Sequence, residues 1–211
     1  MIEGVLTTGA VWAEVRGAPP EGGLVPGEEA LVARAVTKRR RAFAAGRSCA
    51  HRALDELGAP AGPVLSGPGG EPLWPEGVSG SITHCAGYAA AAVAWATDVP
   101  TLGIDAEPHG PLPAGVLDAV ARSEERARIR KLAEDHPTVH WDRVLFSAKE
   151  SVYKAWYPRA RRMLGFEDAD VTIGGDGTLT VHLLVPGPLE ALTGRWTVAD
   201  SLVLTATLRV L

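Results

Sequence analysis

The stretch that decides the fold runs from Ser79 to Pro108 and reads SGSITHCAGYAAAAVAWATDVPTLGIDAEP. It contains three short segments that favour strands, at 79–85, 87–96 and 101–108, and turn residues separate them. The middle segment is the weakest of the three because alanine favours helix over strand. The spacing predicts three strands that form the first sheet of the molecule.

Upstream of this stretch the pattern predicts one strand and a helical region. Residues 5–16, VLTTGAVWAEVR, alternate loosely and are rich in β-branched side chains, and GAPPEGG at 17–23 ends the strand. From 27 to 57 apolar residues recur at helical steps, and Gly46 marks a break between two predicted helices.

Downstream the chain turns helical and then extended. Three helices are predicted, at 113–120, 123–136 and 138–157, with the third ending at Pro158. Four antiparallel strands follow, at 168–174, 177–185, 195–200 and 201–211. The outline is an α+β chain with two comparable halves, 1–107 and 108–211, although the residues themselves show no repeat.

Composition excludes several classes of protein. The chain has 211 residues, of which 46% are hydrophobic and 22% charged, as in a folded globular protein. A net charge of −4 gives no general attraction to nucleic acid or to an anionic membrane. Two cysteines, Cys49 and Cys85, exclude a disulfide scaffold and suit a reducing cytosol. Without a signal peptide or a long apolar stretch, the sequence predicts a cytoplasmic protein with neither nucleic acid nor membrane as partner.

Positive charge is concentrated in one place. Residues 31–52 contain seven basic side chains and no acid. On a helix Arg40 and Arg47 lie seven apart and share a face, with Arg39 about a quarter turn away, so guanidinium groups can converge on a phosphorylated ligand. The alternative is a solvated helix face in a chain that uses arginine far more often than lysine.

Acidic residues suggest a cation site. Asp105 and Glu107 flank Ala106, and in a strand both carboxylates point to the same side. Mg²⁺ prefers oxygen ligands and commonly uses one or two protein carboxylates together with substrate phosphates. The alternative is a polar strand end before the turn at Pro108.

The segment FSAKESVYKAWY adds a helical face with both charges. Glu150 and Lys154 are four residues apart, which is also the spacing of an ordinary surface ion pair. Two of the four lysines of the chain, Lys149 and Lys154, fall within this segment, and a lysine offers a compact ammonium donor. His84 ends a predicted strand, where its imidazole can meet a phosphate, serve as a base or simply be a satisfied strand-end histidine.

Three blocks, GSITHCAGYAAAAVA, LGIDAEPH and FSAKESVYKAWYP, together resemble the signature of the surfactin-type 4′-phosphopantetheinyl transferases, particularly their short actinobacterial members. The segments KRRRAFAAGRSCAHRALDELG, WPEGVSGSITHC and GFEDADVTI resemble the same group. The resemblance implies a monomer with two pseudo-twofold α+β halves that enclose coenzyme A between them. It also implies transfer of the phosphopantetheine arm of coenzyme A to a serine of an apo acyl, peptidyl or polyketide carrier protein, with release of 3′,5′-ADP.

The resemblance also implies roles for individual residues. Asp105, Glu107 and Glu150 hold Mg²⁺, for which Mn²⁺ can substitute, and Glu150 is either the third metal ligand or the base for the incoming serine. Lys154 stabilises the phosphoryl group and the departing 3′,5′-ADP, and His84 contacts a phosphate, so the catalytic set is Glu150, Lys154 and His84. The residues predicted to bind coenzyme A are Arg39, Arg40, Arg47, His84, Lys149 and Lys154.

One departure and two rival functions accompany this interpretation. The loop before EPLWP usually carries a cation in the family, whereas this chain has Gly69 and Gly70. A Mg²⁺-dependent nuclease or phosphodiesterase would use similar acids, but it typically places lysine two residues after an acid on a strand. A non-catalytic coenzyme A-binding module would need no metal site. The identity of the carrier proteins, the tolerance for acyl-coenzyme A and the choice between Glu150 and a metal-bound water as base stay open.

Overall fold

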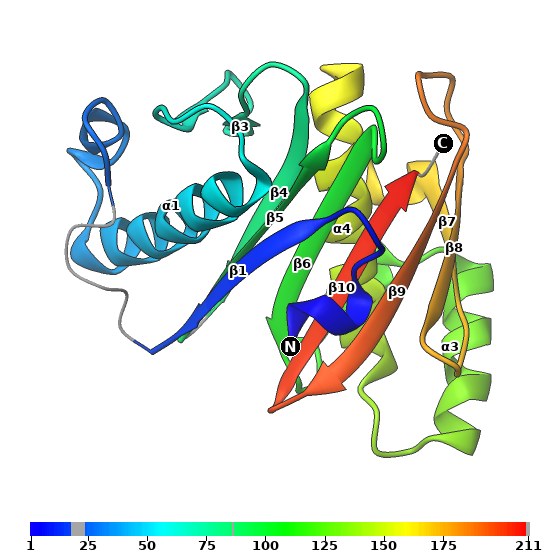
Figure 1. Cartoon of the computed structure of the whole chain (residues 1–211). Helices are drawn as coiled ribbons and strands as arrows, with labels where there is room; N and C mark the ends of the chain where they lie inside the picture. The colour runs from blue at the N-terminus through cyan, green and yellow to red at the C-terminus, as the bar shows by residue number, and fades with distance from the viewer. Residues whose placement is uncertain (18–23, 86, 210–211) are drawn as a thin grey trace.

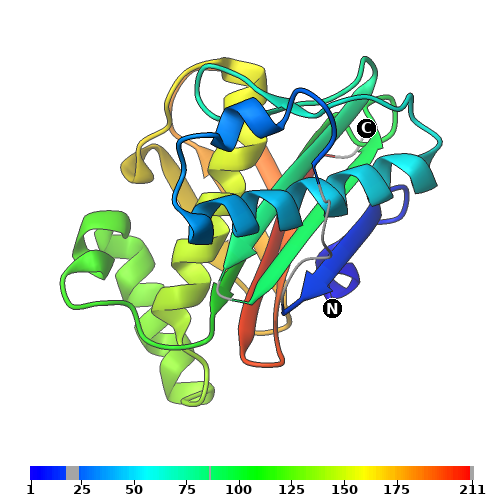
Figure 2. The same cartoon turned by 90° about the vertical axis from the view of Figure 1, so that its left-hand side faces the viewer.

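The computed structural model describes residues 1–17, 24–85 and 87–209 of the chain. Its first sheet has the strand order β1-β5-β4, with β1 at Val11–Arg16, β5 at Tyr88–Trp95 and β4 at Val78–Cys85. Helix α1 (Thr37–Leu57) crosses one face of this sheet, as Figure 2 shows. Alanines of β5 and of α1 meet there in a shared core, and small side chains let the helix lie close to the strand.

The second sheet has five antiparallel strands in the order β6-β10-β9-β8-β7. Their bounds are β6 Thr101–Pro108, β7 Ala169–Ile173, β8 Thr178–Leu183, β9 Ala191–Ala199 and β10 Leu202–Arg209. Helices α3 (Ser123–Asp135) and α4 (Trp141–Ala160) cover one face of it, and α2 (Val116–Val120) precedes them (Figure 1). The buried Trp156 anchors α4 in the core on this face.

A further core joins the two sheets. Alternate residues of β5, β6 and β10 pack together on the faces opposite to α1 and α4, and the short helix η1 (Ile2–Val5) covers them (Figure 1). The remaining elements are short, namely η2 (Glu29–Val32), the pair β2 (Leu65–Ser66) and β3 (Pro72–Leu73), and η3 (Phe166–Asp168). Among the described residues, every helix is too short or too polar to span a membrane.

The α+β class predicted from the sequence is confirmed, but the prediction that 101–108 belongs to the first sheet is wrong. Strand β6 pairs along its whole length with β10, from Thr101 opposite Arg209 to Pro108 opposite Leu202. This antiparallel ladder satisfies the backbone groups of β6 on that edge, which is why the strand joins the C-terminal sheet. The sequence boundary at residue 107 therefore falls inside a strand of the second sheet.

Side-chain hydroxyls connect the two sheets where β4 faces β6. The Ser81 hydroxyl accepts a hydrogen bond from the backbone N–H of Ile104 at 3.1 Å, and the Thr83 hydroxyl accepts one from Ala106 at 3.0 Å. The paired residue numbers rise together, so the two strands run parallel. We call this contact the β4–β6 seam. Hydroxyl groups take the place of carbonyl acceptors and keep two buried N–H groups satisfied.

The predicted break at Gly46 is wrong, because α1 continues without interruption from Thr37 to Leu57. Gly46 is instead a point of close packing between α1 and β4. A Cβ added at this position would lie 2.8 Å from Cγ2 of Ile82. The glycine therefore lets the helix approach the sheet and does not end the helix.

Other boundaries differ from the predictions by a few residues. The first strand begins at Val11 and not at residue 5, since residues 2–5 form η1. Helix α4 contains Pro158 and continues to Ala160, where Arg161 ends it with a left-handed φ of 50°. The helix predicted to start at 27 begins at Thr37, after η2. Residues 18–23 of the predicted break GAPPEGG, and the last two residues of the final strand, lie outside the described ranges.

Candidate active site

The acidic pair of β6 lies on the side of the strand that faces α4. Ala106, between the two acids, is fully buried in the core on the opposite face. Asp105 and Glu107 both contact side chains of α4, so the predicted alternation is confirmed. Asp105 is only 4% exposed. A carboxylate buried to this degree needs donors around it, and the seam and α4 supply them.

Asp105 is held by three donors from two elements. Lys154 Nζ lies 2.7 Å from its Oδ1, and the Ser147 hydroxyl donates to its Oδ2 at 2.8 Å. The Thr83 hydroxyl of β4 lies 3.3 Å from Oδ1. Lys154 also donates to the Thr83 oxygen at 3.3 Å and to the carbonyl of Ile104 at 3.1 Å. The lysine of α4 thus joins both strands of the β4–β6 seam.

Glu107 is paired with a different cation. Arg143, in the first turn of α4, donates from Nη1 to Oε2 of Glu107 at 2.9 Å. Burial and the nearby Asp105 raise the pKa of Glu107, while Arg143 opposes that shift. Burial is the larger of the two causes that disfavour the charged carboxylate, and the cations Arg143 and Lys154 partly offset them.

Glu150 is left without a partner of this kind. Among the described residues, its carboxylate makes neither an ion pair nor a side-chain hydrogen bond, and Lys154 pairs with Asp105 instead. Burial and then the charge of Asp105 raise the pKa of Glu150. A partly buried carboxylate with a raised pKa is a better proton acceptor near neutral pH than an ordinary glutamate.

The three carboxylates suit a hard divalent cation by their chemistry. All the ligand atoms they offer are oxygens. The charge of Asp105 contributes to raising the pKa of both Glu107 and Glu150, so a cation placed among the three would relieve the repulsion between the carboxylates. In the described part of the chain no three acidic, histidine or cysteine side chains already form a ligand cluster. Lys154 and Arg143 now neutralise two of the acids.

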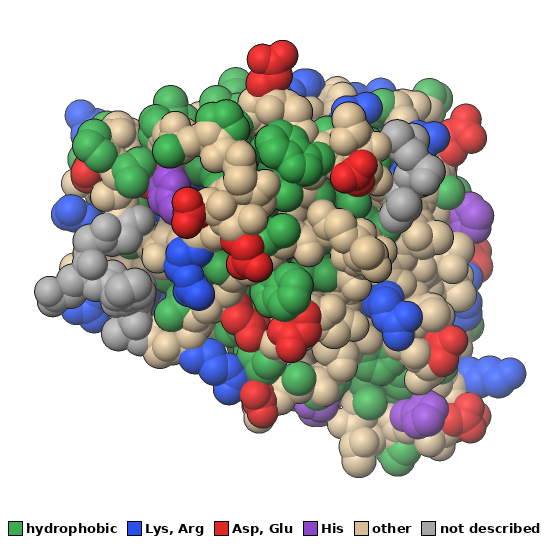
Figure 3. Space-filling view, in the orientation of Figure 1, with side chains coloured by type: hydrophobic (Ala, Val, Ile, Leu, Met, Phe, Trp, Pro, Cys, Tyr) green, Lys and Arg blue, Asp and Glu red, His purple; other side chains and the backbone are tan. Residues whose placement is uncertain are grey.

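His84 lies at the end of β4, between this acidic group and the start of α1. It lines a cavity of about 930 Å³ together with basic residues of α1 (Lys38, Arg39 and Arg41) and apolar residues that include Val15, Phe43 and Tyr88. The protein atoms around the imidazole, and then the Lys154 ammonium, lower the pKa of His84. In Figure 3 lysine and arginine side chains project at several points along the left end of the molecule, where α1 lies.

The three arginines singled out in the sequence do not all reach this cavity. Arg39 lines it, whereas Arg40 and Arg47 do not. Arg47 is only 4% exposed and lies with its guanidinium 4.4 Å from the Phe43 ring centre. It donates to the Ser66 hydroxyl at 3.1 Å, while its buried Nε has no partner among the described residues. Arg40 is exposed to solvent.

The ammonium of Lys149 is not placed to bind a phosphate of coenzyme A, although the side chain lines a cavity beside Glu150. Its side chain is 2% exposed and forms an ion pair of 2.8 Å with Glu125, which is fully buried. Its ammonium also donates to the carbonyls of Phe166 and Ala169. This ammonium is enclosed within the protein, whereas the side chain of Lys154 is 26% exposed, and Lys149 fixes α3 and β7 against α4.

The loop that lacks the family's cation closes onto the end of α4. Gly69 packs against the Tyr157 ring so closely that a Cβ there would lie 2.3 Å from it. The N–H of Gly69 donates to Oε2 of Glu71, and the N–H of Gly70 donates to the Gly67 carbonyl. Arg161 pairs with Glu71. Both glycine N–H groups are thus engaged within the loop, and Arg161, the residue that ends α4, lies next to it.

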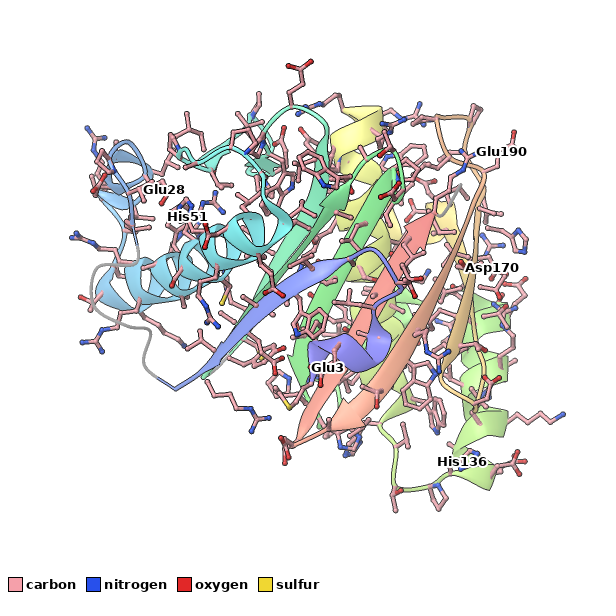
Figure 4. All side chains as sticks on the ribbon, in the orientation of Figure 1. Glu3, Glu28, His51, His136, Asp170 and Glu190 are labelled. Atoms are coloured by element: carbon pink, nitrogen blue, oxygen red, sulfur yellow. The ribbon has the colours of Figure 1, made fainter. Side chains whose placement is uncertain are left out.

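A smaller cavity opens beside Glu150. It measures about 230 Å³ and is lined by Lys149, Glu150, Tyr153 and the segment that follows α4, including Met163, Leu164 and Phe166. Its walls are mostly apolar. Figure 4 shows a separate contact, in which the buried Glu28 lies beside His51 of α1 with Oε1 2.9 Å from Nε2, and this contact ties the segment before α1 to the helix.

Sequence reasoning missed Thr83, Ser147 and Arg143 in this group. Thr83 and Ser147 are small hydroxyl residues that a pattern cannot distinguish from strand and helix filler. Arg143 lies seven residues before Glu150, and this separation places the two on one helical face, which is the signal that could have identified it.

Comparison with known proteins places the chain in a family. The model of the 4′-phosphopantetheinyl transferase N-terminal domain matches residues 27–94, and that of the 4′-phosphopantetheinyl transferase superfamily matches residues 101–206. The 4′-phosphopantetheinyl transferase Svp of Streptomyces mobaraensis is 54% identical over 87% of this chain and 77% of its own length. PptT of Mycobacterium tuberculosis is 48% identical over 92% and 90%, and Npt of Nocardia iowensis is 46% identical over 98% of both chains. The chain belongs to the 4′-phosphopantetheinyl transferase superfamily.

Proposed function

We propose that the group on β6 and α4 carries out the reaction of this family, with Asp105, Glu107 and Glu150 as its acidic residues. The enzyme transfers the 4′-phosphopantetheine arm of coenzyme A to a serine hydroxyl of an apo carrier protein, and 3′,5′-ADP leaves. The order of the signature blocks supports the surfactin type within the superfamily. The carriers are acyl, peptidyl or polyketide carrier proteins.

Asp105 and Glu107 would hold Mg²⁺, or Mn²⁺ in its place, and Glu150 would be either a third ligand or the base for the incoming serine. The cation would supply charge neutralisation at the pyrophosphate, which is most of what phosphoryl transfer requires. Arg143 pairs with Glu107 at 2.9 Å, and Lys154 pairs with Asp105 at 2.7 Å. The carboxylates of Asp105 and Glu107 are thus fixed before any ligand arrives.

Glu150 takes the proton of the incoming serine. The serine oxygen forms a bond to the phosphorus that carries the pantetheine arm, the bond from that phosphorus to the ADP oxygen breaks, and the serine proton moves to the carboxylate. Its raised pKa and the absence of an ion pair in the described residues support this role. Lys154, one helical turn further along α4, supplies positive charge on the side of the leaving group.

Coenzyme A would span the two cavities on either side of the acids. The basic cavity of about 930 Å³ beside α1 suits the 3′-phosphate and nucleotide, with Arg39 and His84 as donors and Arg47 behind Phe43. The apolar cavity beside Glu150 suits the pantetheine arm, which carries uncharged amides and a dimethyl group. Arg40 lies on the exposed face of α1, and its contribution would be general attraction.

The arrangement favours this function over the two rivals. A nuclease would need a basic surface that tracks a polymer, whereas here Lys38, Arg39 and Arg41 line a single cavity whose other walls include apolar side chains. A binding module would gain nothing from the partly buried Glu150, which has no ion pair among the described residues. The cytoplasmic location, the monomeric state, the absence of nucleic acid and membrane partners and the pseudo-twofold halves stay predictions from the sequence.

The ion pair of Lys154 with Asp105 is the observation that carries the proposal, because it joins the two signature blocks next to the His84 strand. The test compares Glu150→Gln and Glu107→Ala with the wild type, measuring both turnover of a carrier protein and binding of coenzyme A by calorimetry. We expect turnover to fall at least a hundredfold in each variant. Coenzyme A should bind Glu150→Gln within a few-fold of the wild type, and unchanged turnover would reject the assignment.

A further inference from the structure

The guanidinium of Arg143 is fixed by contacts on three sides. Nη1 donates to Oε2 of Glu107 at 2.9 Å, Nε donates to the carbonyl of Gly110 at 3.1 Å, and Nη2 donates to that of Pro111 at 2.9 Å. The side chain is 15% exposed. A planar fork with every nitrogen engaged cannot turn without losing several hydrogen bonds together.

The segment that receives these bonds is itself tied to the start of α4. The Leu112 N–H donates to Oδ2 of Asp142 at 2.8 Å, and the His140 N–H donates to Nε2 of His109 at 3.2 Å. The His109 N–H bonds to the carbonyl of Ser201 at 2.8 Å. The chain leaving β6 is therefore anchored at several points, and Arg143 is the member of this anchor that reaches the acidic group.

Arg143 occupies one oxygen of Glu107 and leaves the other. Among the described residues, Oε1 of Glu107 has neither a hydrogen bond nor an ion pair, whereas Oε2 is held by Arg143. A carboxylate with one oxygen fixed by a guanidinium has its plane and its remaining lone pairs set in advance. Partners of this kind behind a metal ligand typically change metal affinity by about 10–100-fold.

We propose that Arg143 is a positioning residue that holds Oε2 of Glu107 and leaves Oε1 as the oxygen for the divalent cation. The proposal rests on the proposed function, because it takes Glu107 as a metal ligand. Arg143 itself touches neither cation nor substrate. It sets the direction of Glu107 and ties the acid to the anchored segment 109–112.

The test measures binding of Mn²⁺ by electron paramagnetic resonance, with and without coenzyme A, for the wild type, Arg143→Met, Arg143→Lys and Glu107→Gln. We expect Arg143→Met to bind Mn²⁺ about 10–100-fold more weakly than the wild type. Arg143→Lys keeps a charge but loses the fork, so its affinity should fall between the two. If Arg143→Met does not fold, Arg143→Lys decides, and wild-type affinity in that variant would overturn the proposal.

A double-mutant cycle separates positioning from a purely structural role. If Arg143 acts through Glu107, then Glu107→Gln combined with Arg143→Met should bind Mn²⁺ no more weakly than Glu107→Gln alone. Losses that simply add would overturn the proposal. Arg195→Met removes an exposed arginine of β9 that has no contact with Glu107 among the described residues, so this control should keep the affinity of the wild type.

The failure of this inference is distinguishable from that of the proposed function. Wild-type protein that binds coenzyme A but no Mn²⁺ would reject the metal site and, with it, the role of Arg143. If the wild type binds Mn²⁺ and Arg143→Met binds it with the same affinity, the metal site stands and only the role of Arg143 is rejected.

Discussion

The hydroxyl oxygen of Thr83 lies 3.0 Å from the backbone nitrogen of Ala106, so a side chain of β4 accepts a hydrogen bond that an adjacent strand would normally receive through its carbonyl. The same oxygen lies 3.3 Å from Lys154 Nζ and from Oδ1 of Asp105. One threonine therefore closes the seam between the sheets and touches the acidic group.

Replacing Thr83 with valine should destabilise the protein. The valine fills the same space but leaves the buried Ala106 N–H without an acceptor, which costs about 1–3 kcal/mol. Thr83→Ser keeps the hydroxyl and should recover most of that stability. Urea unfolding followed by circular dichroism measures the effect, with the exposed Thr180→Val on β8 as a control that should change little. Equal stability of Thr83→Val and wild type would show that the hydroxyl does not support the seam.

Gly103 allows α4 to approach β6, and Gly103→Ala should be among the more damaging single changes. A Cβ at this position would lie 2.0 Å from the carbonyl oxygen of Ser151, so the backbones of helix and strand must separate. Overpacking of this kind costs about 1–3 kcal/mol, occasionally more. The separation should also weaken the pair of Asp105 with Lys154 and lower turnover.

The matched control for this change is Gly62→Ala, where an added Cβ meets no atom within 4 Å. Thermal unfolding and carrier turnover should be measured on both variants. If Gly103→Ala melts at the same temperature as Gly62→Ala, the close approach of α4 to β6 is not as described.

The buried pair of Lys149 with Glu125 should matter for stability and not for coenzyme A. Lys149→Met leaves Glu125 as an unpaired, fully buried carboxylate and should cost about 3–5 kcal/mol. The double variant Lys149→Met with Glu125→Leu removes both charges and should regain much of the loss. Calorimetry should be done on the double variant at a temperature where it is folded, and it should bind coenzyme A with the affinity of the wild type. A tenfold loss of affinity would show that Lys149 takes part in binding coenzyme A.

His84 should titrate below its ordinary value. Crowding by protein atoms and the Lys154 ammonium lower its pKa from 6.5, because both disfavour the charged imidazolium. Removing the cation with Lys154→Met should therefore raise the pKa, and bound phosphates of coenzyme A should raise it in the wild type. Imidazole signals in an NMR pH titration report it, with Arg195→Met as an unchanged control. If the pKa of His84 in Lys154→Met is equal to or lower than that in the wild type, the placement of His84 beside Lys154 is contradicted.

The sequence predicts the elements of the site better than their arrangement. The helical pattern of 138–157 and the strand pattern of 101–108 identify α4 and β6, because each pattern is local. Alternation does not say which strand pairs with β6, and its partner β10 lies at the far end of the chain. The alanines of β5 lower its local preference for a strand. The segment is nevertheless a strand, because one face packs against α1 and the other against the core formed with β6 and β10.

The sequence also does not show which charged residues belong to the site. Lys149 and Lys154 look equivalent along the sequence, yet one faces Glu125 and the other Asp105, since five residues turn a helix by more than a full turn. The partners decide which lysine belongs to the site, and they come from α3 and β6. Arg47 also depends on tertiary structure, because Phe43 and Ser66 define its surroundings.

The most direct measurement mixes the protein with coenzyme A, Mg²⁺ and an unmodified acyl carrier protein, and reads the intact mass of the carrier with and without EDTA. The account predicts a gain of one phosphopantetheine arm that disappears with EDTA and when the carrier serine is replaced by alanine. A gain that persists in EDTA would contradict the metal role of Asp105, Glu107 and Glu150. No gain on acyl, peptidyl and polyketide carriers, with coenzyme A still bound, would contradict the transferase itself.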